Sequence, residues 1–190
     1  MDLWTAIVVG AIVAVGATGF ALTRVANIIR NSGVEVLVPF FDTAASLPIG
    51  PGGTDVTVEV DQGVLTVSGL PGMVVTSLVA AVVVELVMTL AIVACAGILC
   101  WNLMQGRAFS RTNTRLVIGS AIALLAGTAL GGFFHTVGIN GALATIGDRR
   151  YDSIVASGSL VPYFVAIGLA AVALAFRAGE RMQRETAGLV

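Results

Sequence analysis

The sequence is poor in charged residues and contains no lysine. Charged residues make up 11% of the 190 residues, and all ten basic residues are arginine. A soluble domain has about 25% charged residues, which it needs for a polar surface. The apolar fraction is 57% and the mean hydropathy is +0.98. This composition predicts a chain surrounded largely by lipid, and a formal net charge of −1 argues against direct nucleic-acid binding.

Residue types that carry catalysis and bind cofactors are also scarce. The chain has one histidine, His135, and two cysteines, Cys95 and Cys100, which lie in an apolar stretch. Five positions apart on a helix, the cysteines have neither a redox-motif spacing nor a geometry for a local disulfide. No zinc-protease, serine-hydrolase, phosphate-loop or dinucleotide-binding motif occurs. We therefore expect a non-enzymatic protein with no cofactor and no metal site.

Four apolar runs are long enough, or nearly so, to cross a bilayer. They cover residues 3–24, 73–103, 116–137 and 160–176. A helix needs about 20 such residues to span a hydrocarbon core of about 30 Å. The first run lacks a basic n-region and exceeds a signal-peptide core in length, so we expect it to be retained. These runs predict an all-α membrane protein, a four-transmembrane-helix bundle that forms a single membrane domain over residues 1–190.

Residues 31–72 have a different character. Apolar residues alternate with polar ones over 34–40 and 54–60, which is typical of strands. Pro and Gly at 47–53 predict a loop, and Asp61-Gln62-Gly63 predicts a turn before another strand at 64–68. The segment between the first two helices is therefore expected to be a small extracytoplasmic β-hairpin or meander. A Gly-rich, partly charged loop is expected at 138–158.

The arginines predict the orientation. One side of the predicted membrane carries six arginines and three acids, and the other carries four arginines and seven acids. Cytoplasmic loops are enriched in basic residues. We therefore expect both termini in the cytoplasm, with residues 177–190 as a cytoplasmic helical tail. Trp4 and Trp101 would then lie at the inner interface, where aromatic residues concentrate.

Two short stretches carry a family resemblance. Residues 106–119 read GRAFSRTNTRLVIG, and residues 176–185 read FRAGERMQRE. They resemble the G-x-x-F-S-x-x-N loop and the F-x-x-G-x-x-L-Q-x-E tail of a bacterial four-span membrane family, domain of unknown function 2975. Met182 stands where the tail usually has Leu. The resemblance implies a four-span topology in a bacterial plasma membrane, and a membrane partner for a cytoplasmic helix-turn-helix regulator.

The loop and the tail also supply the candidate partner surface. Ser110 is expected to cap the third helix, and Asn113 to bond loop carbonyls. Arg177, Arg181 and Arg184 lie at i, i+4 and i+7, and Glu180 is placed to pair with Arg184. The chosen residues are Arg107, Phe109, Ser110, Asn113, Arg115, Arg177, Arg181, Arg184 and Glu185. Two interpretations stay open: a helix start with arginines that anchor to anionic lipid, or a docking surface for a cytoplasmic protein.

Within the predicted spans, Glu85 stands out because a carboxylate in lipid is costly without a partner. Arg24 and His135 are expected at similar depth. We hypothesise that Glu85 bonds one of them and fixes the helix packing. Alternatively, the three line a polar path in a small transporter or channel component. The pattern Gly127-Thr-Ala-Leu-Gly131 permits close helix approach, within one chain or in a homo-oligomer or larger complex.

Overall fold

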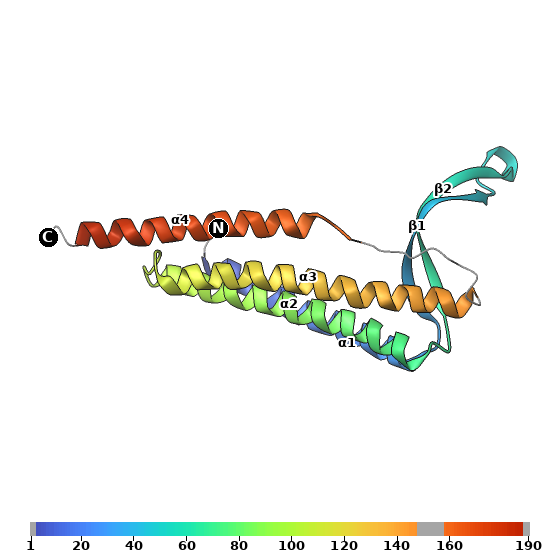
Figure 1. The fold of residues 1–190 in the computed structure, drawn as a ribbon, viewed down its shortest axis with the longest axis horizontal. Coiled ribbons are helices and arrows are strands. Elements are labelled where there is room, and N and C mark those ends of the chain that lie inside the picture. Colours follow the sequence, from blue (N-terminus) through green and yellow to red (C-terminus); the bar gives the residue numbers. More distant parts are fainter. Residues whose placement is uncertain (1–2, 148–157, 188–190) are drawn as a thin grey trace. The chain divides into compact units, whose positions relative to one another are not determined.

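The computed structural model describes residues 3–147 and 158–187, without the side chains of 41–43, 183–184 and 186–187. The chain runs through a helix, a hairpin and three further helices (Figure 1). The elements are α1 (Leu3–Arg30), β1 (Val34–Leu47), β2 (Val56–Val67), α2 (Gly72–Met104), α3 (Arg111–Ile146) and α4 (Val161–Ala187), with a 3-10 turn at Pro51–Gly53. All four helices are long and apolar enough to cross a membrane, as predicted.

The end of α3 corrects one predicted boundary. Residues 138–146 are helical, not part of a Gly-rich loop. A Cβ at Gly138 would collide with the side chain of Leu78, and one at Gly141 would collide with Val74. These glycines therefore allow α3 to approach α2 closely and do not interrupt the helix. Residues 148–157 of the predicted loop, including Arg149 and Arg150, lie outside the described residues.

Of the two predicted alternatives, a hairpin or a meander, the structure shows a two-stranded hairpin. β1 and β2 pair antiparallel from Val34 opposite Val67 to Leu47 opposite Val56, with an irregularity between Pro39 and Thr43. Residues 61–63, predicted to turn, lie within β2. A Cβ at Gly63 would lie 2.7 Å from Cε2 of Phe40. Gly63 thus makes room for an aromatic ring, while the Pro- and Gly-rich segment at 48–55 makes the turn, as predicted.

Asn31 joins α1 to the hairpin. It follows the last residue of α1 and has a φ of 52°, in the left-handed region that Asn tolerates better than most residues. Its Nδ2 donates to the carbonyl of Leu70 at 2.9 Å, and its Oδ1 accepts from the amide of Leu70 at 2.8 Å. The two ends of the hairpin are therefore held together where the chain enters and leaves it. Nothing in the local sequence indicated this role.

The chain forms two compact units that share α1, α2 and α3. The hairpin unit comprises Val25–Ala80 and Phe133–Ser157, and the helical unit comprises Met1–Arg24, Ala81–Gly132 and Gly158–Val190. The hairpin unit buries isoleucine and leucine side chains in a core of its own, together with valines of the hairpin. The buried residues include Ile28, Val34, Val36, Val38, Leu70, Leu78, Ile139 and Leu143.

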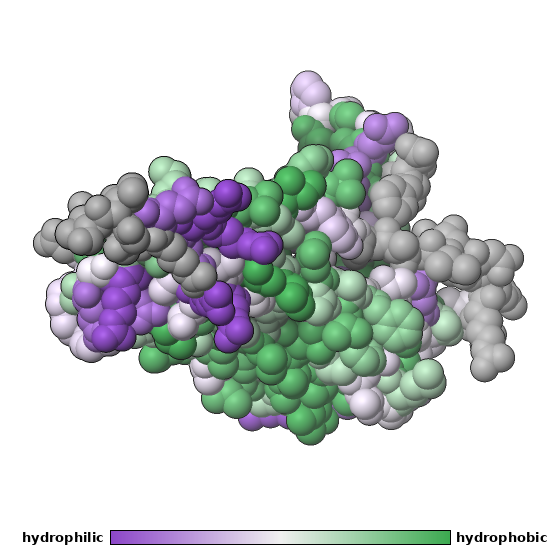
Figure 2. Space-filling model, turned by 60° about the vertical axis from the view of Figure 1, so that its left-hand side comes forward, coloured by the Kyte–Doolittle hydropathy of each residue, from purple (hydrophilic) through white to green (hydrophobic). Residues whose placement is uncertain are grey.

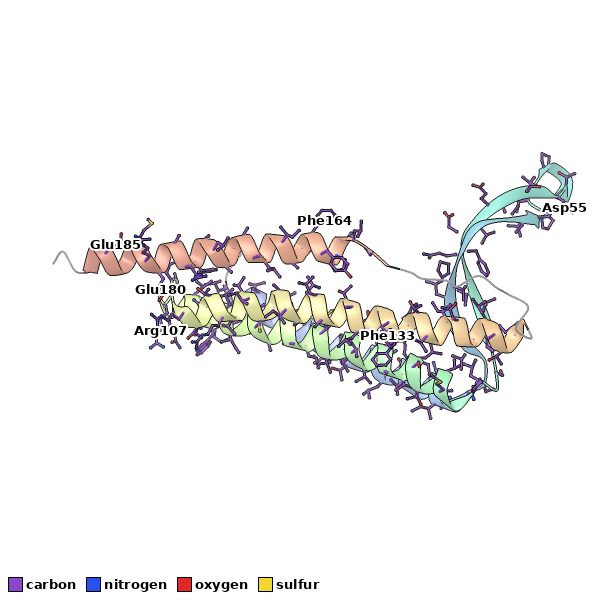
Figure 3. All side chains as sticks on the ribbon, in the orientation of Figure 1. Asp55, Arg107, Phe133, Phe164, Glu180 and Glu185 are labelled. Atoms are coloured by element: carbon purple, nitrogen blue, oxygen red, sulfur yellow. The ribbon has the colours of Figure 1, made fainter. Side chains whose placement is uncertain are left out.

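The helical unit has the opposite arrangement. Among the described residues, its buried apolar side chains are no larger than valine, namely Ala21, Ala81, Val82, Val117, Ala166 and Ala173. Large apolar side chains point outward instead. Phe20 is 65% exposed. Phe164 on α4, labelled in Figure 3, is 69% exposed. Hydrophobic residues cover the middle of the face seen in Figure 2. Small residues between helices and large ones outside are typical of helices that pack in lipid, where the solvent is as apolar as leucine.

α4 packs through one narrow face. Ala166 and Ala173 are buried, and Leu169, Phe176 and Glu180 are half-buried. The spacing between these residues alternates between three and four, which is the seam of a helix packed side by side with its neighbours. This seam brings the C-terminal part of α4 to the loop between α2 and α3.

Candidate functional site

The loop between α2 and α3 begins with a tight helix cap. Gly106 has a φ of 75°. Its N–H donates to the carbonyl of Leu103 at 3.0 Å, and the N–H of Arg107 donates to the carbonyl of Asn102 at 3.0 Å. These two bonds form a Schellman motif, for which glycine is the preferred residue. The first residue of the loop motif is therefore explained by backbone geometry.

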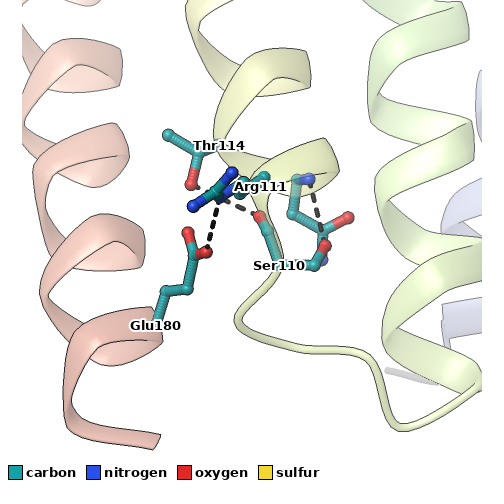
Figure 4. A network of polar contacts seen from close by, with 5 residues as sticks. Ser110, Arg111, Thr114 and Glu180 are labelled. Atoms are coloured by element: carbon teal, nitrogen blue, oxygen red, sulfur yellow. Dashed lines mark hydrogen bonds and ion pairs between the residues drawn. The ribbon is translucent and has the colours of Figure 1, made fainter. Parts of the chain in front are cut away.

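Ser110 and Asn113 hold the loop to the start of α3. Ser110 Oγ accepts from the amide of Asn113 at 3.2 Å, which confirms the predicted N-cap (Figure 4). Asn113 Nδ2 donates to the carbonyls of Arg107 at 2.7 Å and Ala108 at 2.8 Å, as predicted. Its Oδ1 accepts from Asn102 Nδ2 at 2.8 Å.

Asn113 is 0% exposed, so it has no surface to offer a partner. Its assignment to the partner surface is therefore wrong. The same bonds that fix the loop take up its amide group, because a buried amide must have its hydrogen bonds satisfied within the fold. Asn113 is a structural residue of the loop.

Phe109 joins the loop to the tail. Its ring centroid lies 5.9 Å from that of Phe176. A Cβ at Gly179 would lie 2.5 Å from Cε1 of Phe109, closer than real side chains approach. The Phe and Gly of the tail motif thus pack against the Phe of the loop motif. Phe109 is 42% exposed, so its inner side holds α4 while its outer side remains accessible.

Two ion pairs lie beside this contact. Arg111 Nε is 3.3 Å from Glu180 Oε1, and Glu180 is only 17% exposed (Figure 4). Arg181 Nε is 2.8 Å from Glu185 Oε1, one turn along α4. The predicted partner of Glu180 was Arg184, whose side chain lies outside the described residues. Arg111 was not among the predicted site residues, because no local spacing indicates a contact between residues on different helices.

The first turns of α3 and the end of α4 enclose an open groove of about 920 Å³. Its lining residues are Arg111, Thr114, Arg115, Arg177, Ala178, Glu180, Arg181 and Glu185. Arg115 and Arg177 are exposed and form no ion pair within the residues that the structure describes. Hydrophilic residues gather on this side of the molecule in Figure 2. The structure therefore brings together the predicted Arg115, Arg177, Arg181 and Glu185, whereas Arg107 lies in the loop.

The predicted polar cluster is assembled only in part. Arg24 and Glu85 line one cavity of about 70 Å³ between α1 and α2. They form no ion pair in the described chain, and the Arg24 guanidinium carbon lies 5.7 Å from the Phe20 ring centroid. Of the two hypothesised partners of Glu85, Arg24 therefore forms no ion pair with it among the described residues. His135 belongs to the hairpin unit and is not among the residues that line this cavity.

The small-residue pattern serves packing within the chain. A Cβ at Gly127 would lie 2.6 Å from Cβ of Met88, and one at Gly131 would lie 3.8 Å from Cγ1 of Val84. Both neighbours are on α2, so Gly127 lets α3 pass close to it. Across the described residues, no group of three or more His, Cys, Asp or Glu side chains is placed to hold a metal ion.

No protein-family model, curated protein or solved structure matches the chain. The resemblance to the four-span family therefore stays a prediction that rests on the loop and tail motifs.

Proposed function

We propose that the chain is a multi-pass protein of a bacterial cytoplasmic membrane, with both termini inside and the hairpin outside. The outward-facing large apolar residues of the helical unit support this proposal, because lipid is the solvent that favours such a surface. The arginines of the loop and tail support the orientation.

The length of α1 within the helical unit agrees with a bilayer. Trp4 and Trp101 pack edge to face with ring centroids 6.2 Å apart, an arrangement suited to one interface. From Trp4 to Arg24, the helix is about 30 Å long at 1.5 Å per residue. This is the thickness of the hydrocarbon core, so Arg24 would lie at the outer boundary.

Within this topology, the protein acts as a non-enzymatic accessory or regulatory subunit. Its groove between α3 and α4 binds an acidic segment of a cytoplasmic protein, which the family resemblance implies to be a helix-turn-helix regulator. The observation that carries this proposal is the pair Arg115 and Arg177, exposed in the groove without an ion pair among the described residues. Guanidinium groups bind carboxylates through two parallel hydrogen bonds, which gives strength and direction. Binding would sequester the partner at the membrane.

A peptide-binding experiment tests the groove. The full chain is placed in nanodiscs of phosphatidylcholine and titrated with a fluorescent peptide that carries four Glu, and with the same peptide carrying Gln instead. Wild-type protein is expected to prefer the Glu peptide. Replacing Arg115 and Arg177 by Gln should weaken that binding by roughly tenfold or more, because each lost bond between charged groups is worth about 1.5–3 kcal/mol.

The matched control is Arg107→Gln, which removes an arginine of the loop that does not line the groove. Its affinity should stay near that of the wild type. Equal weakening by Arg107→Gln and by the groove variants would mean that general positive charge, not the groove, attracts the peptide. A chain that remains monodisperse without any amphiphile would overturn the membrane proposal itself.

A further inference from the structure

We infer that the cavity between α1 and α2 binds the headgroup of a phospholipid that carries both a phosphate and a primary ammonium. The ammonium lies at Glu85 and the phosphate at Arg24. This inference depends on the proposed membrane topology but not on the proposed groove, which lies at a different place in the helical unit.

The cavity presents two opposite charges that do not neutralise each other. Arg24 and Glu85 both line it, both are exposed, and no ion pair joins them in the described part of the chain. Unpaired charges at the edge of a hydrocarbon layer are costly. An occupant with one anionic and one cationic group would satisfy both side chains at once.

The size and polar lining fit the ammonium end of such a headgroup. The volume of about 70 Å³ is enough for an ammonium and its neighbouring carbon. Thr89 also lines the cavity and donates its hydroxyl hydrogen to the carbonyl of Glu85 at 2.8 Å. The Thr89 oxygen can therefore accept a hydrogen bond from the ammonium, beside the Glu85 carboxylate.

The phosphate would remain at the mouth of the cavity, where Arg24 is exposed. A guanidinium offers a phosphate two parallel N–H donors. Phe20 lies beneath the Arg24 guanidinium and restricts its positions. A quaternary ammonium has no N–H to donate to Glu85, and a glycerol headgroup has no cation, so both fit less well.

The surroundings indicate a lipid and not a soluble zwitterion. Phe20 on α1, at 65% exposed, and the half-buried Leu86 on α2 are apolar residues of the cavity lining. Acyl chains can lie along such a surface. Arg24 follows an apolar stretch about as long as the hydrocarbon core is thick, which places it where headgroups begin.

Lipid competition tests the inference. The purified full chain is equilibrated in micelles with equal amounts of phosphatidylethanolamine, phosphatidylcholine and phosphatidylglycerol, and the retained lipid is counted by native mass spectrometry. Phosphatidylethanolamine should be retained in preference to both others. Glu85→Gln should remove its advantage over phosphatidylcholine, a loss of roughly tenfold for one hydrogen bond between charged groups. Arg24→Gln should lower retention of all three lipids.

Glu59→Gln serves as the matched control, because Glu59 is an exposed acid on β2 that does not line the cavity. Its lipid preference should equal that of the wild type, and unchanged helicity would show that each variant folds. Equal retention of the three lipids by wild-type protein would overturn the inference, as would an unchanged preference in Glu85→Gln. Displacement of the bound lipid by equimolar soluble O-phosphoethanolamine would overturn its assignment to a lipid.

The two proposals can fail separately. Replacing Arg115 and Arg177 should leave lipid preference unchanged, and Glu85→Gln should leave the affinity for the acidic peptide unchanged. If the wild-type protein did not prefer the acidic peptide but kept its lipid preference, only the proposed groove would be contradicted.

Discussion

The contact between Phe109 and Gly179 should decide whether replacing Gly179 by Ala stabilises or destabilises the protein. In a helix, replacing Gly by Ala normally stabilises by about 1 kcal/mol because the backbone loses less freedom on folding. At position 179 of α4, however, the new Cβ would collide with the ring of Phe109. Crowding of this kind costs about 1–3 kcal/mol. Gly179→Ala should therefore destabilise the wild-type protein by up to about 2 kcal/mol.

Removing the ring should reverse the effect. Phe109→Ala alone gives up the contact with Phe176, worth about 0.5–1.5 kcal/mol beyond the area it buries. In this background the space beside position 179 is open. Gly179→Ala should then stabilise by about 1 kcal/mol, and the coupling between the two substitutions should be about 1–3 kcal/mol.

The assay is equilibrium unfolding in mixed micelles as the dodecyl sulfate fraction rises, followed by far-ultraviolet circular dichroism. Four proteins complete the cycle: wild type, both single variants and the double variant. Gly168→Ala is the control on the same helix, since nothing lies within 4 Å of a Cβ there, and it should have equal effects with and without Phe109. If Gly179→Ala has the same sign and size in both backgrounds, the contact between loop and tail is refuted.

Three further substitutions test the fold by the same unfolding assay. Asn113→Ala should lower the free energy of unfolding by about 1–3 kcal/mol, because it leaves buried carbonyls unsatisfied. Arg107→Ala, on the surface, should change it by no more than about 0.5 kcal/mol. Equal effects of the two substitutions would contradict the buried role of Asn113. Asn31→Ala should destabilise the protein more than Asn31→Gly does. Both variants lose the side-chain hydrogen bonds, but only Gly tolerates the left-handed φ. The reverse order would contradict the role of Asn31 at the end of α1. Gly127→Val should cost about 1–3 kcal/mol of stability by crowding Met88, and much less in a Met88→Ala background. An equal cost in both backgrounds would contradict the contact between Gly127 and Met88.

Local features of the site were largely predictable. Ser110 caps α3 as expected because an N-cap bonds an amide only three residues away. Asn113 bonds nearby loop carbonyls for the same reason. Its complete burial was not predictable, because the third partner, Asn102, comes from the preceding helix. A polar residue in a basic loop looks like surface until the packing around it is known.

Contacts between distant segments were not predictable. The side chain of Arg111 meets that of Glu180 across two helices, and Arg24 faces Glu85 without bonding it. Counting residues along the predicted spans placed Arg24 and Glu85 at similar depth. Such a count could not show that Arg24 lies over Phe20, or that His135 belongs to a different unit.

The sequence by itself determined the four apolar helices, the hairpin with its Pro- and Gly-rich turn, and the basic character of loop and tail. These follow from composition and short-range periodicity, which act over a few residues. The tertiary structure decided what the glycines do: Gly63 makes room for Phe40, Gly138 for Leu78 and Gly179 for Phe109. The physical reason is that periodicity shows which residues share a face, whereas only packing decides which neighbour that face meets.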